Sequence, residues 1–260
     1  MWLDVPNKKL EQTIKLAELF NSWQGEYPFT GDWTTFIRFH ACNLECPWCD
    51  TMYTPHSIAS KPYAIKTILE HINQTRSITF TGGEPSLFLN DIETIWEVLK
   101  DTMLPVRRIT FETNGTRLGE LLRFIDVILE PVKSITHVIW SPKFYNQDVT
   151  RKMLQVLYND YDPTKNIYIK IVADKQVENQ IKKFLYELSR LYGDTALQKT
   201  AVMPLTDVEF LELQESKISE IRNMQKKASI SKEALEYAKR LAREYQVGLS
   251  MRLHIIANFD

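Results

Sequence analysis

The stretch HACNLECPWCDTMY, residues 40–53, holds all three cysteines of this chain, Cys42, Cys46 and Cys49, in the spacing C-x3-C-x2-C. Three thiolates on one short loop suit a soft metal or an iron–sulfur cluster. A structural zinc site normally closes with four protein ligands, so zinc would need a histidine as its fourth ligand. A [4Fe–4S] cluster on three cysteines would leave one iron open to a small molecule. Three incidental thiols are the remaining interpretation.

The bulk composition predicts one α/β domain that spans residues 1–260. Hydrophobic residues make up 44% of the chain and the formal net charge is −1, so no basic excess points to nucleic acid or to an acidic membrane surface. The first residues, MWLDVPNKKLEQ, are polar, and no apolar run approaches the length of a membrane span. An odd number of cysteines without a leader argues for reduced thiols, so we expect a cytoplasmic protein.

Strand-like and helix-like segments alternate from residue 34 onward. Such alternation predicts a parallel sheet built by right-handed crossovers. Periodicity alone leaves open whether the sheet is doubly wound or curled as a full or partial barrel. The expected strands are rich in Ile, Val, Phe and Thr, and they cover residues 34–40, 77–82, 107–114, 137–143, 166–174, 200–205 and 248–254.

Apolar stripes at helical spacing mark the segments between these strands. Residues 65–72, 92–99 and 177–188 each show the i, i+3, i+4, i+7 pattern, and the last is expected to stop near residue 193. Asn90 and Glu93 predict a capping box for the second stripe.

Two regions are less regular. Residues 8–23 fit a helix or a strand equally well. Residues 206–246 are charged and predicted to be a mostly helical elaboration, with Ser231 as a possible N-cap. Scaffold is its default role, against a dimer surface or a dock for a reductant.

The candidate motifs follow the expected strands. The cysteine loop comes after the first strand, GGEP (82–85) after the second, ETNGT (112–116) after the third and SPK (141–143) after the fourth. Chemistry in parallel α/β folds gathers at the carboxyl ends of the strands. We therefore expect these motifs to meet at one edge of the sheet, although Glu112 and Asn114 could serve only to shape a turn.

The spacing C-x3-C-x-φ-C, with Trp48 as the aromatic residue, resembles the signature of radical S-adenosylmethionine (SAM) enzymes. The resemblance implies a partial (β/α) barrel with parallel strands and outer helices. It also implies a [4Fe–4S] cluster on Cys42, Cys46 and Cys49, and SAM bound at the open iron as a source of the 5′-deoxyadenosyl radical. The SAM contacts that it implies are Trp48, Cys49, Asp50, Gly82, Gly83, Glu84, Ser141, Pro142 and Lys143.

Residues 21–53 narrow the resemblance. They are similar to 7-carboxy-7-deazaguanine synthases, whose pattern runs S-x-Q-G-E-G and then F-V-R-x-x-G-C-N-L-x-C-x-W-C-D-T-x-Y. The family converts 6-carboxy-5,6,7,8-tetrahydropterin into 7-carboxy-7-deazaguanine, a queuosine precursor, with loss of ammonia. The substrate-binding residues that the resemblance implies are Trp23, Gln24, Gly25, Glu26, Arg38 and Thr81.

The same resemblance implies Mg²⁺ at Thr51, a flavodoxin-like electron donor and a homodimer. By residue type alone, Thr51 could be a turn residue and Arg38 an ordinary surface ion pair. The chain departs from the family at Tyr27 and Ala41, which replace glycines. Two rival interpretations are an activase that makes a glycyl radical on a partner protein, and a zinc- or cluster-stabilised binding module without chemistry.

Overall fold

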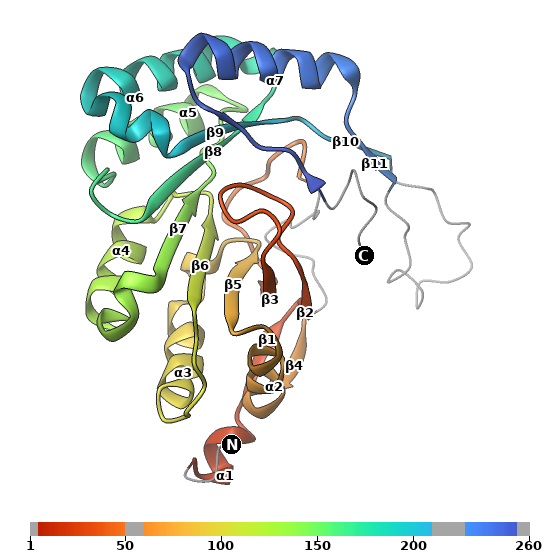
Figure 1. Ribbon diagram of the computed structural model, residues 1–260, viewed down its shortest axis with the longest axis vertical. Coiled ribbons are helices and arrows are strands. Elements are labelled where there is room, and N and C mark those ends of the chain that lie inside the picture. The colour runs from red at the N-terminus through yellow and green to blue at the C-terminus, as the bar shows by residue number, and fades with distance from the viewer. Residues whose placement is uncertain (1–4, 50–59, 210–226, 254–260) are drawn as a thin grey trace.

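The computed structural model describes residues 5–49, 60–209 and 227–253. Within them, eight strands form one sheet in the order β12-β9-β8-β7-β6-β5-β3-β2 (Figure 1). Neighbours from β3 to β12 run parallel, which confirms the expected parallel sheet, and β2 adds one antiparallel strand at the edge beside β3. The strands of this sheet are β2 (Glu18–Trp23), β3 (Trp33–Phe39), β5 (Ser77–Gly82), β6 (Arg108–Thr113), β7 (Thr136–Trp140), β8 (Ile167–Ala173), β9 (Thr200–Pro204) and β12 (Gly248–Leu249).

Helices cross over between successive parallel strands. Because the strand order follows the chain without reversal, the crossovers fall on one side and the sheet curls around the other, as in a partial (β/α) barrel (Figure 1). None of the described helices is both long and apolar enough to traverse a lipid bilayer. The helices are α1 (Asn7–Leu10), α2 (Ile65–Thr75), α3 (Leu89–Leu99), α4 (Leu118–Val127), α5 (Gln147–Asn159), α6 (Glu178–Gln198) and α7 (Lys232–Tyr245).

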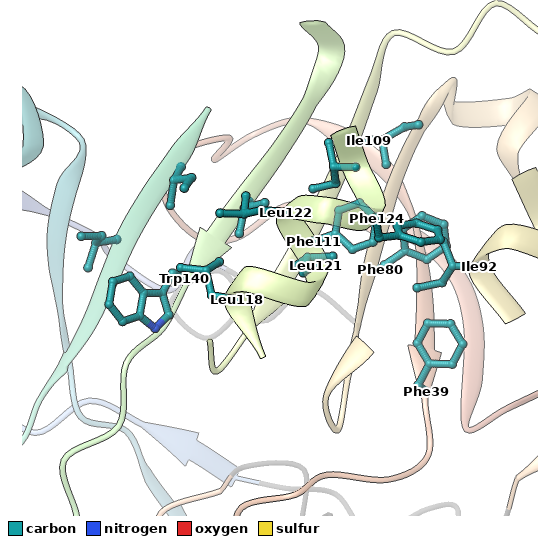
Figure 2. Close-up of a cluster of buried hydrophobic side chains, with 14 of the residues drawn as sticks. Phe39, Phe80, Ile92, Ile109, Phe111, Leu118, Leu121, Leu122, Phe124 and Trp140 are labelled. Carbon is teal, nitrogen blue, oxygen red and sulfur yellow. The ribbon is translucent and has the colours of Figure 1, made fainter. Parts of the chain in front are cut away.

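The hydrophobic core lies between the sheet and these helices. Figure 2 shows the aromatic side chains of neighbouring strands side by side, beneath residues of α4. Ring centroids of Phe39 and Phe80 are 6.3 Å apart, and those of Phe80 and Phe111 are 5.1 Å apart. Since side chains alternate along a strand, the residues between them point into the hollow of the sheet. One face of each strand therefore packs the core and the other lines the site.

The loop that follows β2 bridges the two edges of the sheet. The Gly25 carbonyl accepts a hydrogen bond from the Leu253 amide at 2.9 Å, and the Tyr27 amide donates to Ser250 Oγ at 3.0 Å. Phe29 in the same loop packs edge-on against His137 of β7, with centroids 4.9 Å apart. The first two contacts join the loop after β2 to the segment after β12, and the third joins it to β7.

The N-terminal segment and the start of α3 differ from the local predictions. The segment at 8–23 contains α1, β1 (Thr13–Leu16), which pairs with β4 (Lys61–Ala64), and β2. The capping box was wrong: α3 begins two residues earlier, with Phe88 at the N-cap and no side-chain cap. Its register is set by packing of the apolar stripe, which outweighs the cap preference.

The C-terminal part combines strand and helix. Ser231 caps α7 as predicted, because its Oγ accepts from the Ala234 amide at 3.1 Å. The segment predicted as mostly helical also contains β10 (Asp207–Glu209) paired with β11 (Lys227–Ser229). The strand expected at 248–254 is confirmed only as the short β12.

Candidate active site

A cavity of about 400 Å³ opens at the carboxyl ends of the strands, where the motifs were expected to meet. Fourteen of the predicted site residues line it. Glu84 and Pro142 are not among its lining residues, and Asp50 and Thr51 lie outside the described part of the chain. The predicted residues in the lining are Trp23, Gln24, Gly25, Glu26, Arg38, Cys42, Cys46, Trp48, Cys49, Thr81, Gly82, Gly83, Ser141 and Lys143.

The three cysteines form no disulfide and lie half-buried at one side of this cavity. Burial raises the pKa of Cys42, and it raises the pKa of Cys46 to about 11, with the other two thiols adding to the effect and Lys143 opposing it. Asn114 Nδ2 donates to Cys42 Sγ at 3.7 Å. Desolvated thiolates that repel one another are stabilised by a bound cation, and N–H donors to sulfur suit an iron–sulfur centre. The donor set therefore fits a [4Fe–4S] cluster.

The turn at GGE docks tightly against the start of the cysteine loop. Gly82 has φ +113°, and a Cβ added to Gly83 would lie 1.9 Å from the Ala41 carbonyl oxygen. That carbonyl accepts from the Glu84 amide at 2.8 Å. Ala41 is one of the two departures from the family pattern. It contacts the GGE turn through its backbone carbonyl, which any residue at this position would supply.

Glu84 lies beneath the cavity and not in it. Its side chain is fully buried, and Oε1 accepts from Thr113 Oγ1 at 2.6 Å and from the Ser86 amide at 3.1 Å. Oε2 accepts from the Asn114 amide at 2.7 Å. The carboxylate therefore ties the end of β5 to the end of β6.

Arg38 reaches the mouth of the cavity from β3. Its Nε lies 2.8 Å from Glu18 Oε2, and its guanidinium lies over the Phe20 ring, 5.7 Å from the centroid. The Glu18 side chain is 59% exposed, so this ion pair is of the kind that contributes little to stability. A carboxylated ligand could replace Glu18 at modest cost.

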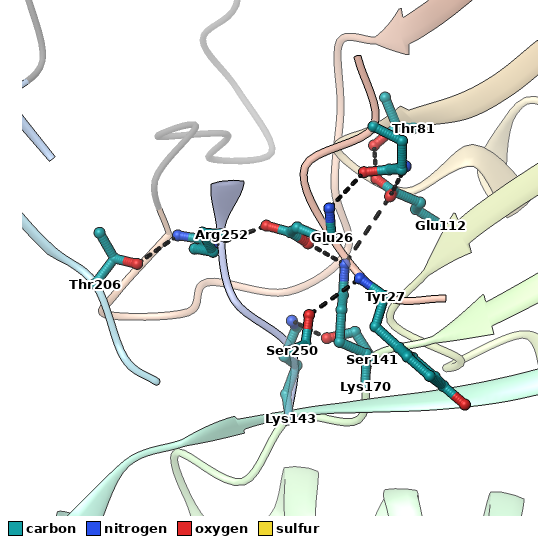
Figure 3. A network of polar contacts seen from close by, with 11 residues as sticks. Glu26, Tyr27, Thr81, Glu112, Ser141, Lys143, Lys170, Thr206, Ser250 and Arg252 are labelled. Atoms are coloured by element: carbon teal, nitrogen blue, oxygen red, sulfur yellow. Dashed lines mark hydrogen bonds and ion pairs between the residues drawn. The ribbon is translucent and has the colours of Figure 1, made fainter. Parts of the chain in front are cut away.

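A charged cluster forms the floor of the cavity (Figure 3). Glu26 lies between two cations: Lys170 forms an ion pair with Oε2, and Arg252 Nε lies 2.8 Å from Oε1. Lys170 Nζ is also 3.9 Å from Glu112 Oε1. Burial lowers the pKa of Lys170, but the attraction of the two carboxylates outweighs it and the pKa is raised.

Neutral side chains extend this cluster. Gln24 Nε2 donates to Glu112 Oε1 at 3.1 Å, while Gln24 Oε1 accepts from the Glu26 amide at 3.1 Å. Thr81 Oγ1 donates to Glu112 Oε2 at 2.7 Å. Gln24 and Thr81 are thus held by Glu112 from β6, a residue that the sequence left undecided between the site and a turn.

Lys170 and Arg252 line the cavity, and the sequence analysis did not predict either as a site residue. For Lys170 the signal was a single lysine inside the otherwise apolar strand IYIKIVA of β8. Asn114 proves to have both roles, since it contacts Cys42 and its Oδ1 accepts from the Thr116 amide at 2.9 Å. Tyr27 does not line the cavity: its ring points away from Glu26 and packs against Tyr168, with centroids 6.0 Å apart (Figure 3).

The fold and the site together define a radical SAM protein. The family described as the radical SAM superfamily matches residues 36–187, more than half of the chain, and the chain belongs to it. Within it, the chain belongs to the 7-carboxy-7-deazaguanine synthase family. It is 30% identical to the synthase of Hyperthermus butylicus over 95% of this chain and 94% of that protein.

Other relatives agree with this assignment. The 7-carboxy-7-deazaguanine synthase of Aquifex aeolicus is 29% identical over 74% of this chain and 80% of its own length. The crystal structure of QueE from Escherichia coli superposes with a TM-score of 0.56 and 19% identity, over 96% of this chain and 100% of that one. At this identity the superposition supports the fold alone.

Proposed function

We propose that the protein converts 6-carboxy-5,6,7,8-tetrahydropterin into 7-carboxy-7-deazaguanine, with loss of ammonia, as a radical SAM lyase in the synthesis of queuosine precursors. The observation that carries the proposal is the single cavity that the three cysteines, the GGE turn and the QGE loop line together. A glycyl-radical activase would not need Gln24, Glu26 and Arg38 around a small cavity. The relatives favour the synthase over the activase.

The protein's own groups have distinct parts in this reaction. A [4Fe–4S] cluster on Cys42, Cys46 and Cys49, together with bound SAM, would supply the hydrogen-abstracting radical. On the same side of the cavity, Trp48 and Gly83 would contact SAM. Cofactors of this kind carry the difficult chemistry, while the protein orients the reactants and excludes water. The remaining SAM contacts of the proposal are Cys49, Asp50, Gly82, Ser141, Pro142 and Lys143, with Glu84 acting through the backbone turn that it fixes.

The opposite wall would hold the pterin. Arg38 would pair with its carboxylate in a charge-assisted hydrogen bond, and the polar groups of the floor would meet its ring. Gln24 and Glu112, which already exchange a hydrogen bond, offer both donors and acceptors there. The proposed substrate contacts are Trp23, Gln24, Gly25, Glu26, Arg38 and Thr81.

Four finer points belong to the same proposal. Mg²⁺ would bind the Thr51 hydroxyl and substrate oxygens, since this ion prefers oxygen ligands. A flavodoxin-like protein would deliver the electron, the enzyme would act as a homodimer, and the reduced thiols suit the cytoplasm. We further propose that residues 1–260 are one radical SAM domain, elaborated at 206–246.

The test is an anaerobic turnover assay. Purified protein is mixed with SAM, dithionite, Mg²⁺ and 6-carboxy-5,6,7,8-tetrahydropterin, and the expected product is 7-carboxy-7-deazaguanine together with ammonia. Absence of product from protein with a full iron complement would favour the activase. Omission of Mg²⁺ should slow turnover if the Thr51 site is correct.

Metal analysis separates the proposal from a zinc-stabilised binding module. Anaerobically purified protein is expected to be brown, with about four irons per chain. The colour should be lost in Cys42→Ala, Cys46→Ala and Cys49→Ala. One zinc per chain without iron, or a coloured Cys46→Ala protein, would contradict the assigned ligands.

A further inference from the structure

Lys170 is the sole lysine or arginine that is buried within the described residues, with 5% of its surface exposed. It sits in the middle of β8 and points into the hollow of the sheet, beside Glu26 and Glu112 (Figure 3). Removing an ammonium group from water costs several kcal/mol unless it gains close ionic partners. A buried lysine at the floor of a ligand cavity therefore calls for a reason beyond packing.

The surrounding charges supply that reason. Three charged residues surround the Lys170 ammonium group: Glu26 in the loop after β2, Glu112 in β6 and Arg252 in the segment after β12. Farther round the cavity wall are Arg38 and Lys143, with the three cysteines. Among these groups Lys170 alone contacts both carboxylates of the floor.

Gln24 ties Glu112 to the loop that carries Glu26. Its Oε1 accepts from the Glu26 backbone amide at 3.1 Å and its Nε2 donates to Glu112 Oε1 at 3.1 Å, while Lys170 joins the two carboxylates in one ionic unit. Two like charges in one buried unit raise each other's pKa, and one of them takes up a proton unless a cation compensates. Without Lys170, the Glu26–Glu112 unit would carry two negative charges against the single cation Arg252.

We propose that Lys170 is a positioning residue that keeps Glu26 and Glu112 both ionised and fixed, so that together they present hydrogen-bond acceptors to the guanidine-like edge of the pterin. This inference rests on the proposed function for its ligand. The 2-amino-4-oxo ring of a pterin carries N–H donors along that edge, and a protonated carboxyl would offer a donor where an acceptor is needed. An ionised carboxylate has about four lone-pair sites, so Glu112 can accept from the ring while it holds Thr81 and Gln24.

The first experiment needs no substrate. The melting temperature of Lys170→Met is compared with that of the unmodified protein between pH 5.5 and 8. Without the ammonium, the folded-state pKa of a floor carboxyl rises above its unfolded value, so stability is lost as pH rises through that pKa. The deficit of the variant should therefore grow with pH, and adding Glu112→Gln should make it independent of pH.

Lys199→Met is the matched control. The Lys199 ammonium donates to the carbonyls of Pro163 and Lys165, each at 2.8 Å, away from the cavity. Its loss should lower the melting temperature by the same amount at every pH. Lys170→Arg, which keeps the cation, should follow the pH profile of the unmodified protein.

The second experiment measures affinity for 6-carboxy-5,6,7,8-tetrahydropterin in anaerobic holoenzyme with SAM bound. In Lys170→Met, a floor carboxyl that is protonated at pH 6 no longer accepts a hydrogen bond from the pterin, whereas at pH 8 it is ionised and can do so. The loss of pterin affinity relative to the unmodified protein should therefore be about tenfold greater at pH 6 than at pH 8, while SAM affinity is unchanged. If the unmodified holoenzyme does not bind the pterin, the proposed function fails, and the melting profiles still judge the role of Lys170.

A deficit of Lys170→Met that is the same at pH 5.5 and pH 8 would overturn the proposal. Should this variant fail to fold even at pH 5.5, the double variant with Glu112→Gln decides. A folded double variant supports the proposal, because one carboxylate then faces one cation. A double variant that also fails to fold contradicts it.

Discussion

At the scale of single residues, Gly83 shows how closely the motifs of the site are fitted together. A methyl group there would meet backbone atoms of Ala41 and Cys42, at 1.9 and 2.8 Å. Backbone cannot rotate aside as a side chain can. Gly83→Ala should therefore lower the free energy of unfolding by about 3 kcal/mol, measured by chemical denaturation.

Gly119→Ala is the control for this prediction. Its added methyl would meet the Asp160 carboxylate at 2.5 Å, which is the far end of a side chain that can move. Within a helix, alanine is also favoured over glycine. Equal losses in the two variants would contradict the close approach of GGE to the cysteine loop.

Arg38 provides a test of the assigned substrate wall. Replacing it with alanine removes a charge-assisted contact worth about 1.5–3 kcal/mol, so the Kd for the pterin should rise at least tenfold. Affinity for SAM should change little. Calorimetric titration of the holoenzyme measures both.

Glu18→Ala is the matched control for Arg38. It removes the exposed partner at 2.8 Å and should leave pterin affinity unchanged or improved. An equal loss of pterin and SAM affinity in Arg38→Ala would argue for a structural role.

The site residues that were predicted lie in contiguous sequence motifs, whereas those that were missed come together only in the folded protein. The cysteine loop and GGE are contiguous in sequence, and strand periodicity alone places them at the same edge of the sheet. Lys170 and Arg252 are far from Glu26 in sequence and meet it only because the sheet curls. A single lysine in an apolar strand indicates burial, but its partners follow from tertiary structure.

At the scale of elements, strand and helix types were predicted well where periodicity was strong. Boundaries were less certain, as the misplaced cap of α3 shows. The start of a helix depends on local side-chain hydrogen bonds and on packing of the apolar face. In α3 the packing decides, so the helix begins at Leu89 and Asn90 does not cap it. Short elements such as β12 and β10 have too few residues for a pattern, and pairing with neighbours decides them.

The caps allow a prediction for three helices. Asn146 and Ser231 cap α5 and α7, accepting from backbone amides at 2.8 and 3.1 Å. Asn146→Ala and Ser231→Ala should each cost about 1 kcal/mol of stability. Asn90→Ala, at an exposed position inside α3, should cost nothing measurable by denaturant titration. If Asn90→Ala lost as much stability as Ser231→Ala, Asn90 would have to be a helix cap after all.

At the scale of the whole molecule, closure of the curled sheet depends on the loop that follows β2. One part of this loop binds the segment after β12, and another part covers the inner face of β7 and β8. The substrate wall and the closure of the fold therefore share one segment. Changes in this loop should affect stability and substrate binding together.

The pKa of His137 depends on how well the loop after β2 covers the inner face of the sheet. The imidazole ring packs against Phe29 and Tyr168, and burial, together with the nearby charge of Arg108, lowers the pKa of His137 to about 4. The unfolded chain then binds a proton on this histidine between about pH 6.5 and 4 that the folded protein does not. Stability contributed by the neutral ring is present above pH 6.5 and is lost as pH falls through this window.

The measurement is the melting temperature of the unmodified protein and of His137→Phe between pH 7 and 4.5. Titration of carboxylates contributes equally to both proteins, so the difference isolates the histidine. The unmodified protein should lose more stability on acidification than His137→Phe does. Parallel curves would mean that the pKa of His137 is the same in the folded and the unfolded protein, and hence that the loop does not exclude water from the inner face of β7.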